Sequence, residues 1–240
     1  MWGIITSKEV TKEKGLENIK TEKQKKHNYI SNISVKEITN IYAPPQNSKG
    51  KIVIIDLGIT KNITEQLKKL NFEIYLAPYN TSSEKILSLN PSGIIISNGP
   101  EEDISHIEII NNVKKLLGKT PILGISLGHL ILAQALGGSA VKMKIGHRGV
   151  NYPVISPKSF KGEITVQNHG YIVNEKSINT NEINIEEINL NDKSIEKMRS
   201  EKYKFISTQY IPASPGFNEV NNIFYEFSDL LLKKGEFVHA

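Results

Sequence analysis

Short, continuous apolar runs alternate with amphipathic segments between residues 51 and 138. A run of four to six apolar residues is typical of a strand covered on both faces. Such runs lie at 52–55, 72–77, 93–96 and 121–123. Apolar residues spaced three or four apart predict helices between them, at 63–70, 83–89, 104–117 and 127–136. Strands that alternate with helices in this way indicate βαβ units and a mostly parallel sheet.

The pattern changes after Gly138. Shorter segments predict partly antiparallel strands, at 141–145, 149–155, 163–167 and 183–190. Residues 205–209 are expected to return to the main sheet, and 220–232 to form a closing helix. The predicted fold is therefore α/β, with a mixed, mostly parallel central sheet flanked by helices.

Residues 1–50 show little sustained periodicity and end in a turn-rich stretch. We predict an N-terminal extension and linker over 1–50 and one domain over 51–240. The extension holds nine lysines and five acidic residues, and so most of the net charge of +5. Because acidic residues interrupt the basic ones and no aromatic residues accompany them, a solvated segment is favoured over a nucleic-acid or membrane surface.

Composition narrows the function classes. With 240 residues, 38% of them hydrophobic, the chain can bury one full-sized core. No apolar run reaches the roughly 18 residues of a membrane span, and no secretory leader is recognisable, so a cytoplasmic protein is expected. The absence of cysteine excludes disulfides, thiolate metal sites and cysteine catalysis.

Residues 124–128, Gly-Ile-Ser-Leu-Gly, join a predicted strand to a predicted helix. The two glycines permit a sharp bend that would hold the Ser126 side chain at the helix N-terminus, where the helix dipole favours negative charge. In open α/β sheets the ligand crevice lies at the carboxyl ends of the strands. Ser126, residues 97–100 and the segment after Phe205 are all expected there, which predicts a single site.

Several motifs occur in an order that carries a family resemblance. They are Asp56-Leu-Gly-Ile, Asn62-Ile, Pro78 with Thr81-Ser82, Leu89-Asn-Pro-Ser-Gly, Ile96-Ser-Asn-Gly-Pro, Gly124-Ile-Ser-Leu-Gly-His, Val141-Lys-Met-Lys-Ile-Gly-His, Gln167-Asn-His-Gly-Tyr and Ala213-Ser-Pro-Gly. Together, over about 51–230, they resemble the class I glutamine amidotransferase domain, which implies a flavodoxin-like fold. They are most similar to the small subunit of carbamoyl-phosphate synthetase. The first 40 residues resemble a remnant of that subunit's N-terminal domain.

In the family that the chain resembles, a cysteine attacks the side-chain amide of glutamine. A histidine acts as base, a glutamate orients it, and ammonia passes to a synthetase partner. Here Ser126 stands at the nucleophile position and Ile211 at the base position, and the glutamate is missing after Pro212. Because a serine hydroxyl depends more heavily on an adjacent base, the resemblance implies a catalytically inactive relative.

The resemblance also implies a set of substrate-binding positions. They are Gly99, Leu127, Leu130, Asn168, Gly170 and Tyr171. Leu130 replaces a glutamine that contacts substrate, and Glu101 replaces a glycine of the oxyanion hole, where a carboxylate opposes the chemistry. Residues 168–171 either hold the amino-acid end of a ligand or form only a required turn, and both interpretations stay open.

A second hypothesis is an enzyme. The Gly-x-Ser-x-Gly pattern also occurs in serine hydrolases, and a residual glutaminase or a hydrolase would use Ser126. His169 is the best candidate base, followed by His129 and His147. None of the three stands at the family's base position.

No cofactor and no metal site are predicted. The acidic residues 101–103 precede a predicted helix, where capping explains them better than a metal site does. Residues 142–147 are expected to form strand and surface rather than an anion site. The possible partners are a synthetase-type large subunit, a second copy of the chain in a homo-oligomer, and a small amino-acid-like ligand.

Overall fold

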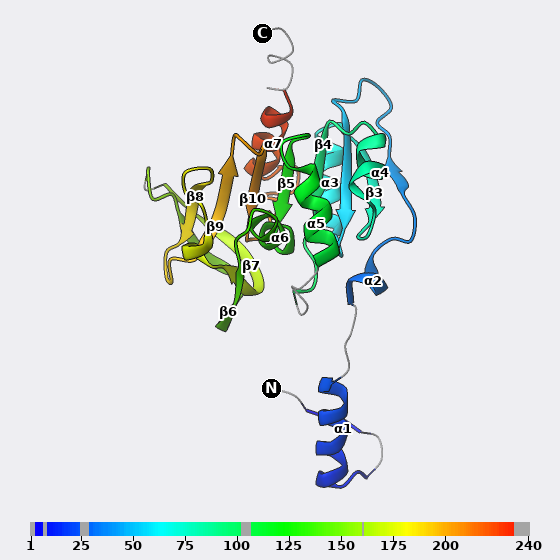
Figure 1. Cartoon of the computed structure of the whole chain (residues 1–240), viewed down its shortest axis with the longest axis vertical. Coiled ribbons are helices and arrows are strands. Elements are labelled where there is room, and N and C mark those ends of the chain that lie inside the picture. The colour runs from blue at the N-terminus through cyan, green and yellow to red at the C-terminus, as the bar shows by residue number, and fades with distance from the viewer. Residues whose placement is uncertain (1–2, 7–8, 25–28, 102–106, 160, 233–240) are drawn as a thin grey trace.

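The structure is a computed structural model and describes residues 3–6, 9–24, 29–101, 107–159 and 161–232. Within these residues one ten-stranded sheet runs through the molecule, with helices on both faces (Figure 1). The strands are β1 (Thr39–Tyr42), β2 (Lys51–Asp56), β3 (Glu73–Pro78), β4 (Gly93–Ile96), β5 (Ile122–Ile125), β6 (Ala140–Ile155), β7 (Gly162–Val173), β8 (Asn184–Asn189), β9 (Ile195–Ser200) and β10 (Phe205–Thr208). Their order in the sheet is β1-β3-β2-β4-β5-β10-β9-β8-β6-β7.

The helices cover the parallel half of the sheet. They are α1 (Lys12–Gln24), α2 (Tyr29–Ile33), α3 (Lys61–Lys69), α4 (Ser83–Ser88), α5 (Ile107–Leu116), α6 (Leu127–Ala135) and α7 (Asn222–Leu232), with a short 3-10 helix, η1 (Glu175–Ser177). No helix in the described part of the chain is long and apolar enough to cross a membrane.

Strands β3, β2, β4, β5 and β10 run parallel to one another. Along β2, Val53 and Ile55 pack in the core that α4, α5 and α6 cover, whereas Ile52 and Ile54 pack in the core beneath α3 and α7. Because successive side chains of a strand point to opposite faces and both faces are covered, every position must be apolar. The α/β fold with a mixed central sheet is confirmed.

Beyond β10 the sheet continues through β9, β8, β6 and β7, in antiparallel pairs. The two strands predicted at 141–145 and 149–155 are one long strand, β6, whose pairing with β7 is irregular at two places. The pattern did not predict β9, because its sequence, Ile-Glu-Lys-Met-Arg-Ser, is half charged.

Part of the predicted extension packs against the sheet. Strand β1 pairs antiparallel with β3, and Ile30 of α2 is only 1% exposed in the core. The backbone N–H of Val35 donates to Asp56 Oδ2 at 2.9 Å. None of the buried core residues in the described part of the chain belongs to α1. The helix predicted over 104–117 is α5; its first residues lie outside the described ranges.

Candidate functional site

Ser126 lies at the sharp bend between β5 and α6. Its backbone has φ 53° and ψ −105°, outside the ordinary regions for an L-residue, and its N–H donates to Thr208 O at 2.8 Å. A Cβ at Gly128 would lie 2.1 Å from Ile96 O, and one at Gly124 would lie 2.8 Å from Gly128 O. Both glycines are therefore required by close backbone approach, and the bend has the shape of a nucleophile elbow.

The histidines of the described part of the chain make no hydrogen bond to the Ser126 hydroxyl; their ring nitrogens have other partners or none. His129 is fully buried, with Nδ1 2.9 Å from Ser207 Oγ. Burial lowers the pKa of His129 to about 3, so it stays neutral. His169 is engaged with Gln167 and Tyr171 instead.

The two positions that the resemblance marks as altered are apolar and built into the fold. Ile211 forms an isolated bridge with β7, in which its N–H donates to Val166 O at 2.9 Å. Leu130 and Leu127 are fully buried in the core under α6. None of these side chains can accept a proton or bind a polar group.

Glu101 crosses from the end of β4 to β7. Its Oε2 accepts hydrogen bonds from the backbone N–H groups of Gly170, at 2.6 Å, and Tyr171, at 3.3 Å. The interpretation of Glu101 as a helix cap is wrong, because its carboxylate binds these two groups, and Glu102 and Asp103 lie outside the described residues. The suggestion that 168–171 form a turn is also wrong, since they belong to β7, where Asn168 is exposed.

The pKa of the Glu101 carboxyl is raised to about 7. Burial is the largest cause, and it outweighs the two backbone hydrogen bonds and the nearby positive charge of Arg148, which lower the pKa. Glu101 thus changes charge near neutral pH at the position where the resemblance places the substrate.

We expect Glu101→Gln to stabilise the protein increasingly as pH rises. An acid whose pKa is higher folded than unfolded loses stability when it ionises, here between about pH 4.5 and 7. Glutamine keeps an acceptor oxygen and never ionises. The gain in free energy of unfolding should approach about 3 kcal/mol at pH 8 and vanish at pH 4. Urea unfolding at both pH values measures it.

The matched control is Glu108→Gln, on the exposed side of α5. A stabilisation by Glu101→Gln that is equal at the two pH values would show that Glu101 does not titrate differently in the folded protein.

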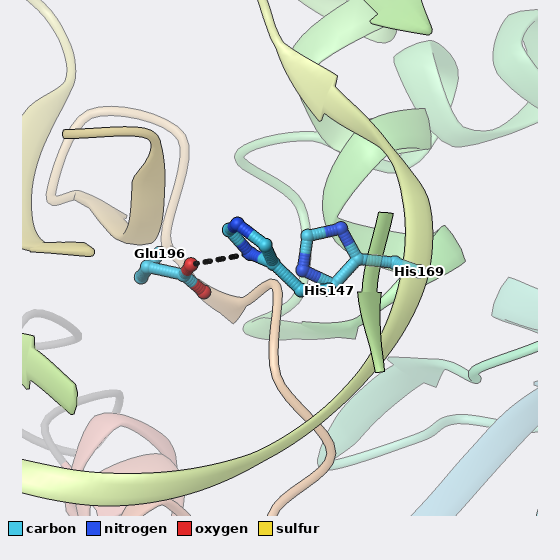
Figure 2. A group of neighbouring side chains, drawn as sticks. All are labelled: His147, His169 and Glu196. Carbon is cyan, nitrogen blue, oxygen red and sulfur yellow. Dashed lines mark ion pairs between the residues drawn. The ribbon is translucent and has the colours of Figure 1, made fainter. Parts of the chain in front are cut away.

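A second polar cluster lies in the antiparallel half of the sheet (Figure 2). His147 of β6 and His169 of β7 are cross-strand partners, with near-perpendicular rings whose centroids are 4.9 Å apart, and Glu196 projects from β9. Sequence reasoning missed this cluster, since its members lie far apart in the chain. The only signal in the sequence was the presence of a histidine in each of two motifs that prove to be paired strands.

Comparison with known proteins places the chain in a family. Residues 53–227 match the family model for class I glutamine amidotransferases. The chain belongs to the class I glutamine amidotransferase family. A solved structure from Thermoplasma acidophilum, described as that of a putative GMP synthase protein, covers 80% of this amidotransferase chain and 98% of its own, with a TM-score of 0.66. At 18% identity it supports the fold alone.

The amidotransferase chain is also related to the small chain of carbamoyl phosphate synthase. The protein of that name from Clostridium acetobutylicum is 39% identical over 203 residues, or 84% of this chain and 57% of the relative. That from Caldanaerobacter subterraneus subsp. tengcongensis is 43% identical over 183 residues, or 76% and 51%. The chain therefore spans little more than half the length of these curated relatives.

Proposed function

We propose that this amidotransferase-family chain does not hydrolyse glutamine. The observation that carries the proposal is the absence of a base hydrogen-bonded to Ser126 within the described residues, with Ile211 at the position that the resemblance assigns to the base. Loss of a triad member typically lowers the rate by about 10⁴–10⁶-fold. A serine in place of the family's cysteine makes the remaining site weaker still.

The position of Glu101 supports the same conclusion. Its carboxylate already accepts the N–H groups of Gly170 and Tyr171, which the resemblance assigns to the amino-acid end of the substrate. A ligand carboxylate would have to displace it, and a buried group that loses its hydrogen bonds costs about 1–3 kcal/mol. Binding of an amino-acid-like ligand is therefore the weaker of the two non-catalytic roles.

We propose that the chain acts by binding a synthetase-type large subunit. The support is the relationship to proteins that are named as the small chain of a synthase. The test is size-exclusion chromatography of the purified chain mixed with the large chain of carbamoyl phosphate synthase from the same organism. Co-elution as a complex is expected. Separate elution at micromolar concentrations would overturn the proposal, and elution of the chain alone as a dimer would favour a homo-oligomer.

The hydrolase alternative gains no support from the geometry of the histidines. His129 and His169 are both engaged with other groups, and burial lowers the pKa of both. Release of ammonia from glutamine, compared with a Ser126→Ala variant, tests the absence of activity.

A further inference from the structure

Three buried side chains from three strands converge in the antiparallel half of the sheet. His147, His169 and Glu196 each offer one ligand atom, and these atoms lie within 4.8 Å of one another (Figure 2). The residues are 7%, 1% and 0% exposed. Buried ionisable groups are costly unless their charges and lone pairs are satisfied, so the hydrogen bonds around this cluster show what it lacks.

The outer nitrogen of His147 is held by a carboxylate. Nε2 lies 3.0 Å from Asp192 Oδ2, which can only accept, so Nε2 carries the proton. Nδ1 of the neutral ring is then a lone pair. It is buried, has no hydrogen-bond partner, and lies 3.7 Å from Glu196 Oε1. His147 therefore directs an unsatisfied acceptor into the cluster.

His169 is held in the same manner. Its Nδ1 lies 2.9 Å from the backbone carbonyl of Tyr171 and must donate, which leaves Nε2 as a lone pair. Nε2 faces Gln167 Oε1 at 2.8 Å, which is also an acceptor. The amide nitrogen of Gln167 donates to Glu196 Oε2 at 2.8 Å, so turning the amide over would only place its oxygen against that carboxylate. The network lacks one positive charge in either orientation.

Metal-binding histidines typically donate their outer N–H to a carboxylate or a backbone carbonyl, which aims the other nitrogen at the ion. His147 and His169 have one of each. Glu196 is oriented by Asn189 Nδ2, which donates to Oε1 at 3.0 Å. Ligands about 2.1 Å from a tetrahedral zinc ion lie roughly 3.4 Å apart, close to the 3.7 Å between His147 Nδ1 and Glu196 Oε1.

We propose that His147, His169 and Glu196 bind a divalent transition-metal ion, for which zinc is the best fit. Two imidazole nitrogens and one carboxylate suit zinc, whereas magnesium and calcium prefer oxygen ligands throughout. The ion would join β6, β7 and β9 next to Gly170 and Tyr171, which hold Glu101. The site requires neither glutamine hydrolysis nor a protein partner, and so it stands apart from the proposed function.

The test is equilibrium dialysis of the tag-free, full-length protein against Zn²⁺ after treatment with a chelator, with bound metal measured by mass spectrometry. We expect about one zinc ion per chain, and tetrahedral visible absorption bands when Co²⁺ replaces zinc. His147→Asn should abolish both. Asp192→Asn, at a half-exposed side chain, should weaken binding about 10–100-fold without altering a ligand.

Asp229→Asn on α7 is the matched control and should bind zinc as the unchanged chain does. Circular dichroism of each variant establishes that it is folded. If His147→Asn does not fold, Asp192→Asn decides the question by its affinity. Substoichiometric binding by the unchanged chain, or unchanged affinity in a folded His147→Asn or Asp192→Asn variant, would overturn the proposal and leave the cluster as a network completed by a proton.

Discussion

The Ser126→Cys variant is expected to release no more ammonia from glutamine than the Ser126→Ala variant, although it restores the nucleophile of the family. A thiol must lose its proton to attack an amide, and a neighbouring base normally takes it. Ile211 supplies none, and His129 is buried against Ser207. The missing base alone keeps the rate about 10⁴–10⁶-fold below that of an intact triad. A coupled assay for ammonia at saturating glutamine measures it.

Ser126→Ala is the control because it removes every nucleophile at the elbow and changes little else. Turnover by Ser126→Cys that exceeds the Ser126→Ala background and titrates with a thiol reagent would show that some other group acts as base.

Lys197→Met is expected to lower the free energy of unfolding by about 3–5 kcal/mol, because it leaves a cluster of carboxylates without their buried cation. The Lys197 side chain is 8% exposed, and its Nζ lies 2.8 Å from Glu226 and 3.5 Å from both Glu186 and Glu187. Burial alone would lower the pKa of Lys197, but the carboxylates, led by that of Glu187, more than offset it and raise the pKa. Urea unfolding at pH 7 measures the loss.

Lys202→Met is the matched control. Lys202 also forms an ion pair, with Glu182, but its side chain is 58% exposed, so water replaces the lost interaction. We expect a much smaller change than at Lys197. Equal losses in the two variants would show that burial of the Lys197 cluster does not set its contribution.

The parallel half of the fold was predictable from the sequence because its physics is local. Strands β2, β4 and β5 are covered by helices on both faces, so their residues form unbroken apolar runs. The elbow was predictable for a related reason. Gly124 and Gly128 stand where backbone atoms approach too closely for any Cβ.

The antiparallel half was less predictable because its polar residues are satisfied by distant partners. Strand β9 carries Glu196, Lys197 and Arg199, which read as a solvated segment. Glu196 is fully buried because Gln167 and Asn189 donate to it, and Lys197 because carboxylates of β8 and α7 surround it. A local pattern of polar and apolar residues contains no information about such pairing.

The candidate site divides in the same way. The sequence predicted Ser126 and Ile211 as the altered positions, because each stands within a motif. The contact between Glu101 and Gly170 depends on the segment after β4 reaching β7, and the local argument from the helix dipole misassigned it. The approach of His147 to His169 depends on the register of β6 against β7, which periodicity alone does not fix.

The central claim is that this member of the amidotransferase family has kept the elbow without the chemistry. Its most direct test is the formation of ammonia and glutamate from glutamine by the unchanged, tag-free chain, measured alone and together with the large chain of carbamoyl phosphate synthase. The account predicts a rate indistinguishable from that of Ser126→Ala in both conditions. A rate above that background in either condition, lost on substitution of Ser126, would contradict it.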